Sequence, residues 1–166
     1  IWTGYLSSTF GSILATAVRN ELINENVISS SDRKISKTQL QRVKKLSLDG
    51  LIVNDVTSIN GIKWLTNLEE LDLSNNGIDN IDFASSASNL KKIILKNNNI
   101  SDITTLKNHM GLEYIDLSDN NLTEIGYLQN YGNVKYLDLN NNNITDITSV
   151  GNLTLLESVF LNNNKL

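Results

Sequence analysis

Residues 68–166 repeat one pattern of apolar residues at a constant spacing of 22 residues, the distance from Leu68 to Leu90. Each copy reads L-x-x-L-x-L-x-x-N-x-L, and Ile or Val replaces Leu at some positions. The copies begin at Leu68, Leu90, Leu112, Val134 and Leu156. A single copy is too short to bury its own apolar side chains, so neighbouring copies must stack and share one hydrophobic core.

A repeat of this length and phrase is typical of a leucine-rich-repeat solenoid. In each copy the central apolar pair alternates with polar residues, as in a strand with one buried face. Leu71 and Leu73 are therefore expected to face the core. Glu70, Asp72 and Ser74 are expected to face the solvent. Downstream apolar residues recur at steps of three, so we predict an α/β solenoid with a parallel concave sheet and 3₁₀-type turns on the convex side.

The repeats are expected to occupy residues 43–166. A variant first repeat covers 43–67, in which Leu51 stands where the other copies have Asn. The 22-residue repeats then run from residue 68 and are cut short at residue 166. We expect the natural protein to extend beyond both ends of this sequence.

Residues 1–42 are predicted to form an N-terminal helical cap. Apolar residues keep helical spacing from about residue 9 to residue 23, with Phe10 among the first of them. A second helix is expected near Ser36, because Ser36 and Gln39 have the spacing of a capping box. The two helices should shield the edge strand of the first coil.

The asparagine of the repeat recurs where each strand ends and the chain turns sharply. Its amide can donate to and accept from main-chain groups of neighbouring coils, which predicts a buried ladder of hydrogen bonds. The ladder residues are Asn76, Asn98, Asn120, Asn142 and Asn164.

Composition excludes several classes of partner. The formal charge of −4 and the pI near 4.9 argue against nucleic-acid binding, which requires clustered Lys and Arg. No apolar run reaches the roughly 18 to 20 residues of a membrane span. The chain has no cysteine, so it has neither a disulfide nor a thiolate zinc site.

No catalytic or nucleotide-binding motif is present, and we predict a protein that is not an enzyme and has no cofactor or metal site. The one histidine, His109, shares a register position with Tyr131 and is expected to pack on the convex side. Calcium is not expected on the sheet, because the strand with Ile94 separates Asp72 from Asp116.

The outward positions of the strands are the predicted partner-binding site. Tyr114 and Tyr136 fall on adjacent strands and are expected to stack, while Ile94 and Phe160 add exposed apolar anchors. Aromatic residues beside charges are typical of protein-binding hot spots. The predicted site residues are Glu70, Asp72, Lys92, Ile94, Tyr114, Asp116, Tyr136, Asp138 and Phe160.

Two segments, together with the repeats, carry a more specific resemblance. Residues 35–43 (ISKTQLQRV) and 56–68 (VTSINGIKWLTNL) precede the 22-residue repeats, and Phe10 lies at the start of the predicted helix. This combination resembles the internalin-type proteins of Gram-positive bacteria. The resemblance implies a right-handed solenoid that is secreted or attached to the cell wall. It also implies roles in adhesion and virulence, with a host or environmental protein bound by the concave sheet.

Three alternatives remain at this stage. The chain could be a cytosolic scaffold that resembles the short-repeat regulators of protein phosphatases, the substrate-recognition region of a larger enzyme, or a spacer with a solvated sheet and no ligand. We expect a monomer whose open C-terminal coil can associate end to end.

Overall fold

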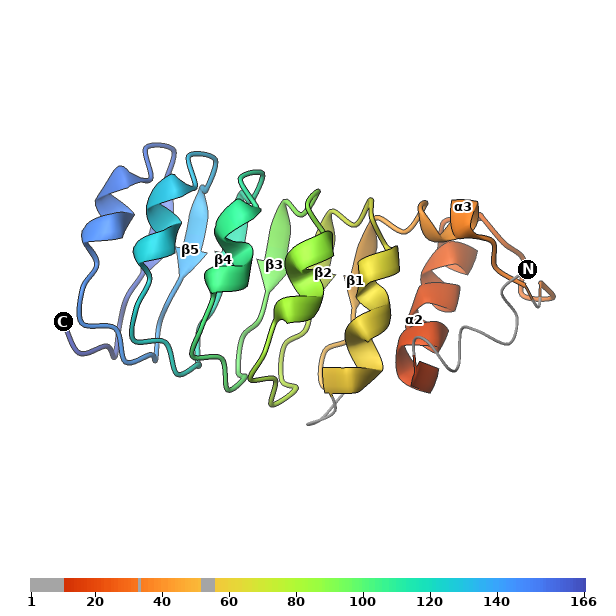
Figure 1. The fold of residues 1–166 in the computed structure, drawn as a ribbon, viewed down its shortest axis with the longest axis horizontal. Coiled ribbons are helices and arrows are strands. Elements are labelled where there is room, and N and C mark those ends of the chain that lie inside the picture. The colour runs from red at the N-terminus through yellow and green to blue at the C-terminus, as the bar shows by residue number, and fades with distance from the viewer. Residues whose placement is uncertain (1–10, 33, 52–55) are drawn as a thin grey trace.

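The computed structural model describes residues 11–32, 34–51 and 56–166 (Figure 1). Within these residues, two α-helices, α2 (Gly11–Asn24) and α3 (Lys37–Leu40), precede the first strand. The six strands are β1 (Lys45–Ser47), β2 (Glu70–Asp72), β3 (Lys92–Ile94), β4 (Tyr114–Asp116), β5 (Tyr136–Asp138) and β6 (Ser158–Phe160). The 3₁₀ helices between them are η1 (Val56–Trp64), η2 (Asp82–Ser86), η3 (Thr104–Asn108), η4 (Gly126–Asn130) and η5 (Thr148–Asn152).

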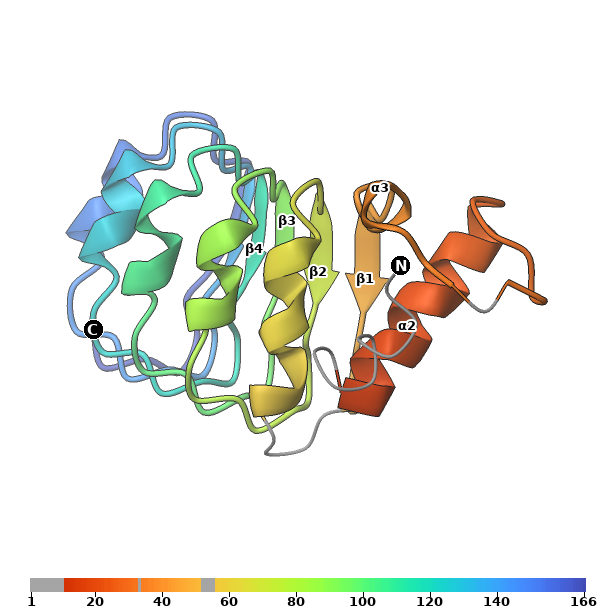
Figure 2. The same cartoon turned by 45° about the vertical axis from the view of Figure 1, so that its right-hand side comes forward.

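The strands form one parallel sheet in chain order, β1 to β6. Their register follows the repeat, so that Leu71 pairs with Ile93 and Ile115 pairs with Leu137. Each coil therefore adds one strand to the sheet and one 3₁₀ helix to the opposite layer, as Figures 1 and 2 show. The prediction of a leucine-rich-repeat solenoid with a parallel sheet and 3₁₀ turns is confirmed.

One hydrophobic core runs through the coils between the two layers. Leu71 and Leu73, which were expected to face it, are 1% and 0% exposed. The core continues into the cap, where Leu14, Val18 and Leu22 of α2 are buried. At the last coil, Val159 of β6 is 40% exposed, and end-to-end association at this coil stays a prediction.

The cap begins its second helix as the sequence predicted. The Gln39 N–H donates to Ser36 Oγ at 3.2 Å, and the Ser36 N–H donates to Gln39 Oε1 at 2.8 Å, which completes the capping box. Figure 2 shows α2 beside β1, at the open edge of the sheet. The expected contribution of Phe10 lies outside the described residues, and the boundary at residue 42 stays a prediction.

The asparagine column forms hydrogen bonds from coil to coil. Asn98 Nδ2 donates to the carbonyl of Leu95 in its own coil at 2.8 Å and to that of Leu73 in the preceding coil at 2.9 Å. Its Oδ1 accepts from the N–H of Ile78 at 2.9 Å. The same donor pattern recurs at Asn76, Asn120, Asn142 and Asn164.

The turn contains a second specialised position that the sequence analysis missed. The residue before each ladder asparagine has a left-handed backbone, with φ between 54° and 59°. Asn and Asp adopt this conformation more readily than other residues with a Cβ atom. The residues concerned are Asn75, Asn97, Asp119, Asn141 and Asn163.

Candidate functional site

The sheet brings the predicted site residues onto one face, in two columns that cross the strands. The first column contains Lys45, Glu70, Lys92, Tyr114, Tyr136 and Ser158. The second column contains Ser47, Asp72, Ile94, Asp116, Asp138 and Phe160. Residues of one column lie on adjacent strands, which are about 4.8 Å apart in a sheet. Binding of a partner by these residues stays a prediction.

Three aromatic side chains form a row over β4, β5 and β6, which we call the aromatic ridge: Tyr114, Tyr136 and Phe160. The two tyrosine rings are stacked, with centroids 4.2 Å apart and planes at 1°. The Phe160 ring is tilted by 47° to that of Tyr136, at 5.5 Å between centroids. At the other end, Lys92 Nζ lies 4.6 Å from the centroid of the Tyr114 ring, within the range of a cation–π contact.

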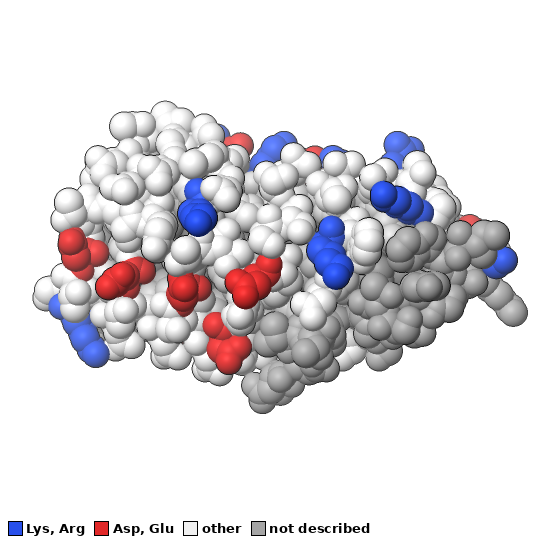
Figure 3. Space-filling model, in the orientation of Figure 1, with Lys and Arg blue, Asp and Glu red and all other residues white. Residues whose placement is uncertain are grey.

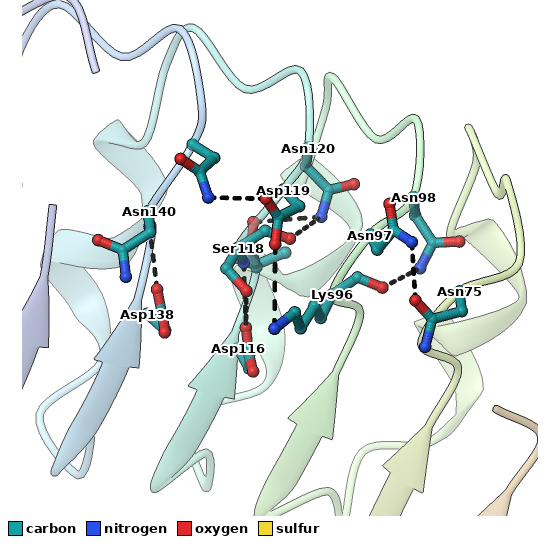
Figure 4. Close-up of polar contacts among 12 residues, drawn as sticks. Asn75, Lys96, Asn97, Asn98, Asp116, Ser118, Asp119, Asn120, Asp138 and Asn140 are labelled. Carbon is teal, nitrogen blue, oxygen red and sulfur yellow. Dashed lines mark hydrogen bonds and ion pairs between the residues drawn. The ribbon is translucent and has the colours of Figure 1, made fainter. Parts of the chain in front are cut away.

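The acidic residues of the second column have a structural role that sequence reasoning missed. Asp116 Oδ1 accepts from the Ser118 N–H at 3.0 Å and from the Ser118 hydroxyl at 2.7 Å (Figure 4). Asp138 Oδ1 accepts from the Asn140 N–H at 2.9 Å. These bonds fix the turn that follows each strand. The signal was the repeated Asp-x-Ser or Asp-x-Asn spacing.

The same turn corrects one prediction. Ser74 was expected to face the solvent, but it is 7% exposed. Its hydroxyl donates to Asp72 Oδ1 at 2.6 Å, and its N–H donates to the same oxygen at 3.0 Å. The strand has ended at Asp72, so the alternation of faces no longer applies at Ser74.

The apolar anchors differ in exposure. Phe160 is 38% exposed. Ile94 was expected to be exposed as well, but it is half-buried among its neighbours on the sheet. It lines a groove of about 280 Å³ together with Glu21 of α2, Glu70 and Asp72. The first coils therefore present a shallow groove beside the cap, whereas β4 to β6 present the aromatic ridge.

Electrostatics also differ along the face. In the first coils, Lys45 Nζ and Glu70 Oε1 form an ion pair at 2.8 Å. Among the described residues, neither Asp116 nor Asp138 forms an ion pair. Burial, and then repulsion from Asp116, raises the pKa of the Asp138 carboxyl, although Lys96 and the bond from Asn140 act in the opposite direction.

A third column beside the face alternates in charge from coil to coil. Glu69 accepts from Lys44 at 2.7 Å on one side and from Lys91 at 2.9 Å on the other. Glu113 and Lys135 continue the alternation with a contact of 2.7 Å. The two lysines hold the pKa of the Glu69 carboxyl at about 2. The sequence analysis did not identify this column, although its period is that of the repeat.

On the convex side, acidic side chains form a row across the face that Figure 3 shows. Two of the acidic residues before these helices act on the backbone. Asp146 Oδ1 accepts from the N–H and hydroxyl of Thr148 at the start of η5, at 2.7 and 2.6 Å. Asp102 makes the same pair of bonds to Thr104 at the start of η3. These bonds at the start of η3 and η5 account for the positions of Asp102 and Asp146.

His109 packs on the convex side, as expected. It is 1% exposed, and its Nε2 lies 3.0 Å from the Ala84 carbonyl oxygen in the preceding coil. The hydroxyl of Tyr131, at the equivalent position one coil later, donates to the Leu106 carbonyl.

Over the part of the chain that the structure describes, no three His, Cys, Asp or Glu residues are grouped to hold a metal. Within the same residues, no helix has both the length and the apolar character to cross a membrane.

Comparison with known families identifies the repeat. The Leucine Rich Repeat family profile matches residues 67–87, 111–130 and 133–153. No curated protein matches the chain significantly.

Solved structures extend the likeness over almost the whole chain. An internalin (InlF) of Listeria monocytogenes is 27% identical, with a TM-score of 0.73 over 96% of this chain, which spans 52% of that structure. Internalin C2 of the same species is 24% identical, with a TM-score of 0.73 over 96% of this chain and 77% of its own. The functional domain of InlJ, also from L. monocytogenes, has a TM-score of 0.77 at 23% identity, over 97% of this chain and 34% of its own. The chain thus spans about half the length of the first of these internalins.

Proposed function

Because the chain is an internalin-type leucine-rich-repeat protein, we propose that it binds a protein partner through its concave sheet and is not itself an enzyme. The observation that carries this proposal is the aromatic ridge. Its three side chains lie on the solvent face of the sheet, where the core does not require them. Aromatic side chains bury a large area on binding and lose little conformational entropy, and they are enriched in interface hot spots.

Preorganisation is the proposed source of affinity. The strands of the ridge are held in register by the sheet, and the turns after them are held by Asp116 and Asp138. The tyrosine rings are held by each other and by Lys92. A partner that docks here would have few side chains to order, which lowers the entropic cost of association.

The site extends, in this proposal, from the ridge across the remaining columns. Glu70, Asp72, Lys92 and Ile94 would form the rim on the side of the cap, and Asp116 and Asp138 would line the ridge. Rim charges chiefly affect the rate of association and the choice of partner, whereas buried aromatic anchors dominate affinity.

We also propose that the protein acts at the surface of a Gram-positive bacterium or after secretion, in adhesion to a host or environmental protein. The support is the sequence resemblance together with the likeness to the Listeria internalins. An antibody against this chain tests the location, since it should label intact cells or react with culture supernatant. Reaction only after lysis would favour the cytosolic scaffold instead.

The binding test compares two variants of the chain with the wild type. Tyr114→Ala with Tyr136→Ala should abolish capture of the partner from host or environmental extracts. Tyr127→Ala is the matched control, because Tyr127 is 42% exposed but lies on η4, on the convex side. Equal capture by the double variant and the wild type would refute the concave site.

A further inference from the structure

The aromatic ridge has its ring faces largely covered. The order of the strands places Lys92 and Tyr136 on opposite sides of the Tyr114 ring. Tyr136 is covered by Tyr114 on one side and flanked by Phe160 on the other. The tyrosines therefore present mainly ring edges and hydroxyl groups to a partner. A ligand that needs an open aromatic face, such as a sugar ring, is poorly matched to this arrangement.

The carboxylates beside the ridge are partly used and partly available. Asp116 and Asp138 are directly opposite each other on β4 and β5. In each, Oδ1 accepts the bonds that hold the turn. The described residues donate no hydrogen bond to either Oδ2, and no lysine or arginine among them pairs with these two residues. Lys96, on the neighbouring strand's turn, lies 4.0 Å from Asp119 instead.

This half of the face therefore carries negative charge that the fold offsets only in part, because Lys96 acts on Asp138 without forming an ion pair with it. Asp116 and Asp138 occupy paired positions on strands that are roughly 4.8 Å apart, and their like charges repel each other. A cation of the partner would relieve that repulsion, and the charge complementarity identifies the chemistry that this surface fits. The coils near the cap differ, because Lys45 already neutralises Glu70 there.

Between the two possible cationic side chains, the geometry favours arginine. A guanidinium is planar and has five N–H donors, so it can donate to two carboxylates at once and also to a nearby hydroxyl oxygen. An ammonium is a compact point charge and is more strongly hydrated. We infer that the Asp116–Asp138 side of the aromatic ridge docks an arginine side chain of the protein partner. This inference rests on the proposed function and specifies the chemistry of the partner.

The test uses capped pentapeptides of glycine and serine with arginine, lysine or citrulline at the centre. Binding to the chain is followed by the NMR shifts of the Asp116 and Asp138 carboxyl carbons. The arginine peptide should bind about tenfold more tightly than the citrulline peptide, which has the same shape without the charge, and more tightly than the lysine peptide. Equal binding of the arginine and citrulline peptides, or of the arginine and lysine peptides, would overturn the inference.

A pair of double variants separates this site from general electrostatics. The double variant Asp116→Asn with Asp138→Asn keeps the oxygen that holds each turn. It should weaken binding of the arginine peptide by roughly tenfold. Asp102→Asn with Asp146→Asn removes the same charge from equivalent turns on the convex side and should leave binding unchanged. Equal weakening by both pairs would reduce the effect to net charge and overturn the inference.

Failure of this inference and failure of the proposed function have different signatures. If the arginine peptide shows no preference while the Tyr114→Ala and Tyr136→Ala variant still loses its partner, the concave face binds a protein by other contacts. If the tyrosine variant keeps the partner as well, the proposed site itself is wrong.

Discussion

The buried asparagine ladder and the concave face lie only a few residues apart in every coil, yet they behave differently along the array. The ladder has Asn at all five positions, because each amide satisfies main-chain groups of its own and the preceding coil. The second column of the concave face changes from Asp72 to Ile94 to Asp116 between successive strands. The difference shows that the fold fixes the residue type where buried polar groups must be satisfied, whereas the second column of the concave face varies from coil to coil.

The strongest way to break this contrast is to remove one ladder residue. Asn120→Ala should lower the free energy of unfolding by about 2 to 3 kcal/mol, because the buried N–H of Ile100 loses its acceptor and the carbonyls of Leu95 and Leu117 each lose one of two asparagine donors. Denaturant unfolding measures the change. Asn121→Ala, at the exposed neighbouring position, is the control and should cost less than about 0.5 kcal/mol. Similar losses in both variants would contradict the structural role of the ladder.

A smaller effect is expected on the convex side. Tyr131→Phe should cost about 1 kcal/mol, because the Leu106 carbonyl loses the buried hydroxyl that donates to it. Tyr127→Phe removes a hydroxyl from an exposed ring and should leave the thermal midpoint unchanged. The pair compares buried and exposed polar groups within one 3₁₀ region, and equal midpoints for the two variants would show that the Tyr131 bond contributes nothing.

The concave face should respond less in stability than the ladder. A double-mutant cycle on Tyr114→Ala and Tyr136→Ala is expected to give a coupling energy of about 0.5 to 1 kcal/mol, which is typical of an aromatic pair. Chemical unfolding of the two single variants and the double variant supplies the numbers. Strictly additive losses would mean that the stacked rings do not stabilise each other, and the ridge would then be less preorganised than proposed.

The smallest effect is expected in the alternating charged column. Because Lys44 and Lys91 hold the pKa of Glu69 at about 2, its contribution to stability is complete above the ordinary pKa of 4.5 and is lost as the pH falls toward 2. Both lysines are about half exposed, so salt should screen the contacts. An NMR titration of the Glu69 carboxyl should give a low midpoint that rises toward 4.5 in 1 M salt. A midpoint of 4.5 at low salt would show that the ion pairs are absent in solution.

Much of the fold and part of the site follow from the period alone. Residues separated by one repeat become neighbours on adjacent strands, which is why the stacking of Tyr114 and Tyr136 is predictable from the sequence. The burial of His109 and the capping box at Ser36 follow from the same register and from local spacing.

The remainder depends on where each strand ends and on how side chains orient. Alternation predicts an exposed Ser74, but the strand stops two residues earlier and the serine turns back to Asp72. A carboxylate at an outward position can accept hydrogen bonds from the turn after its strand or from a partner. The sequence does not distinguish these two roles. The half-buried state of Ile94 depends on neighbours from several strands and from the cap, which no single repeat encodes.

The direction of the ladder bonds has a consequence for how such a protein can change in length. Each asparagine reaches back to the coil before it, so Asn142 serves Leu117 just as Asn120 serves Leu95. The asparagine of a duplicated coil inserted between two others would therefore find the same main-chain carbonyls in the coil before it. The inserted coil would offer the same carbonyls to the asparagine of the coil after it. Genes can lengthen the array in whole coils without redesigning its interior, and each addition would widen the recognition surface by about 4.8 Å.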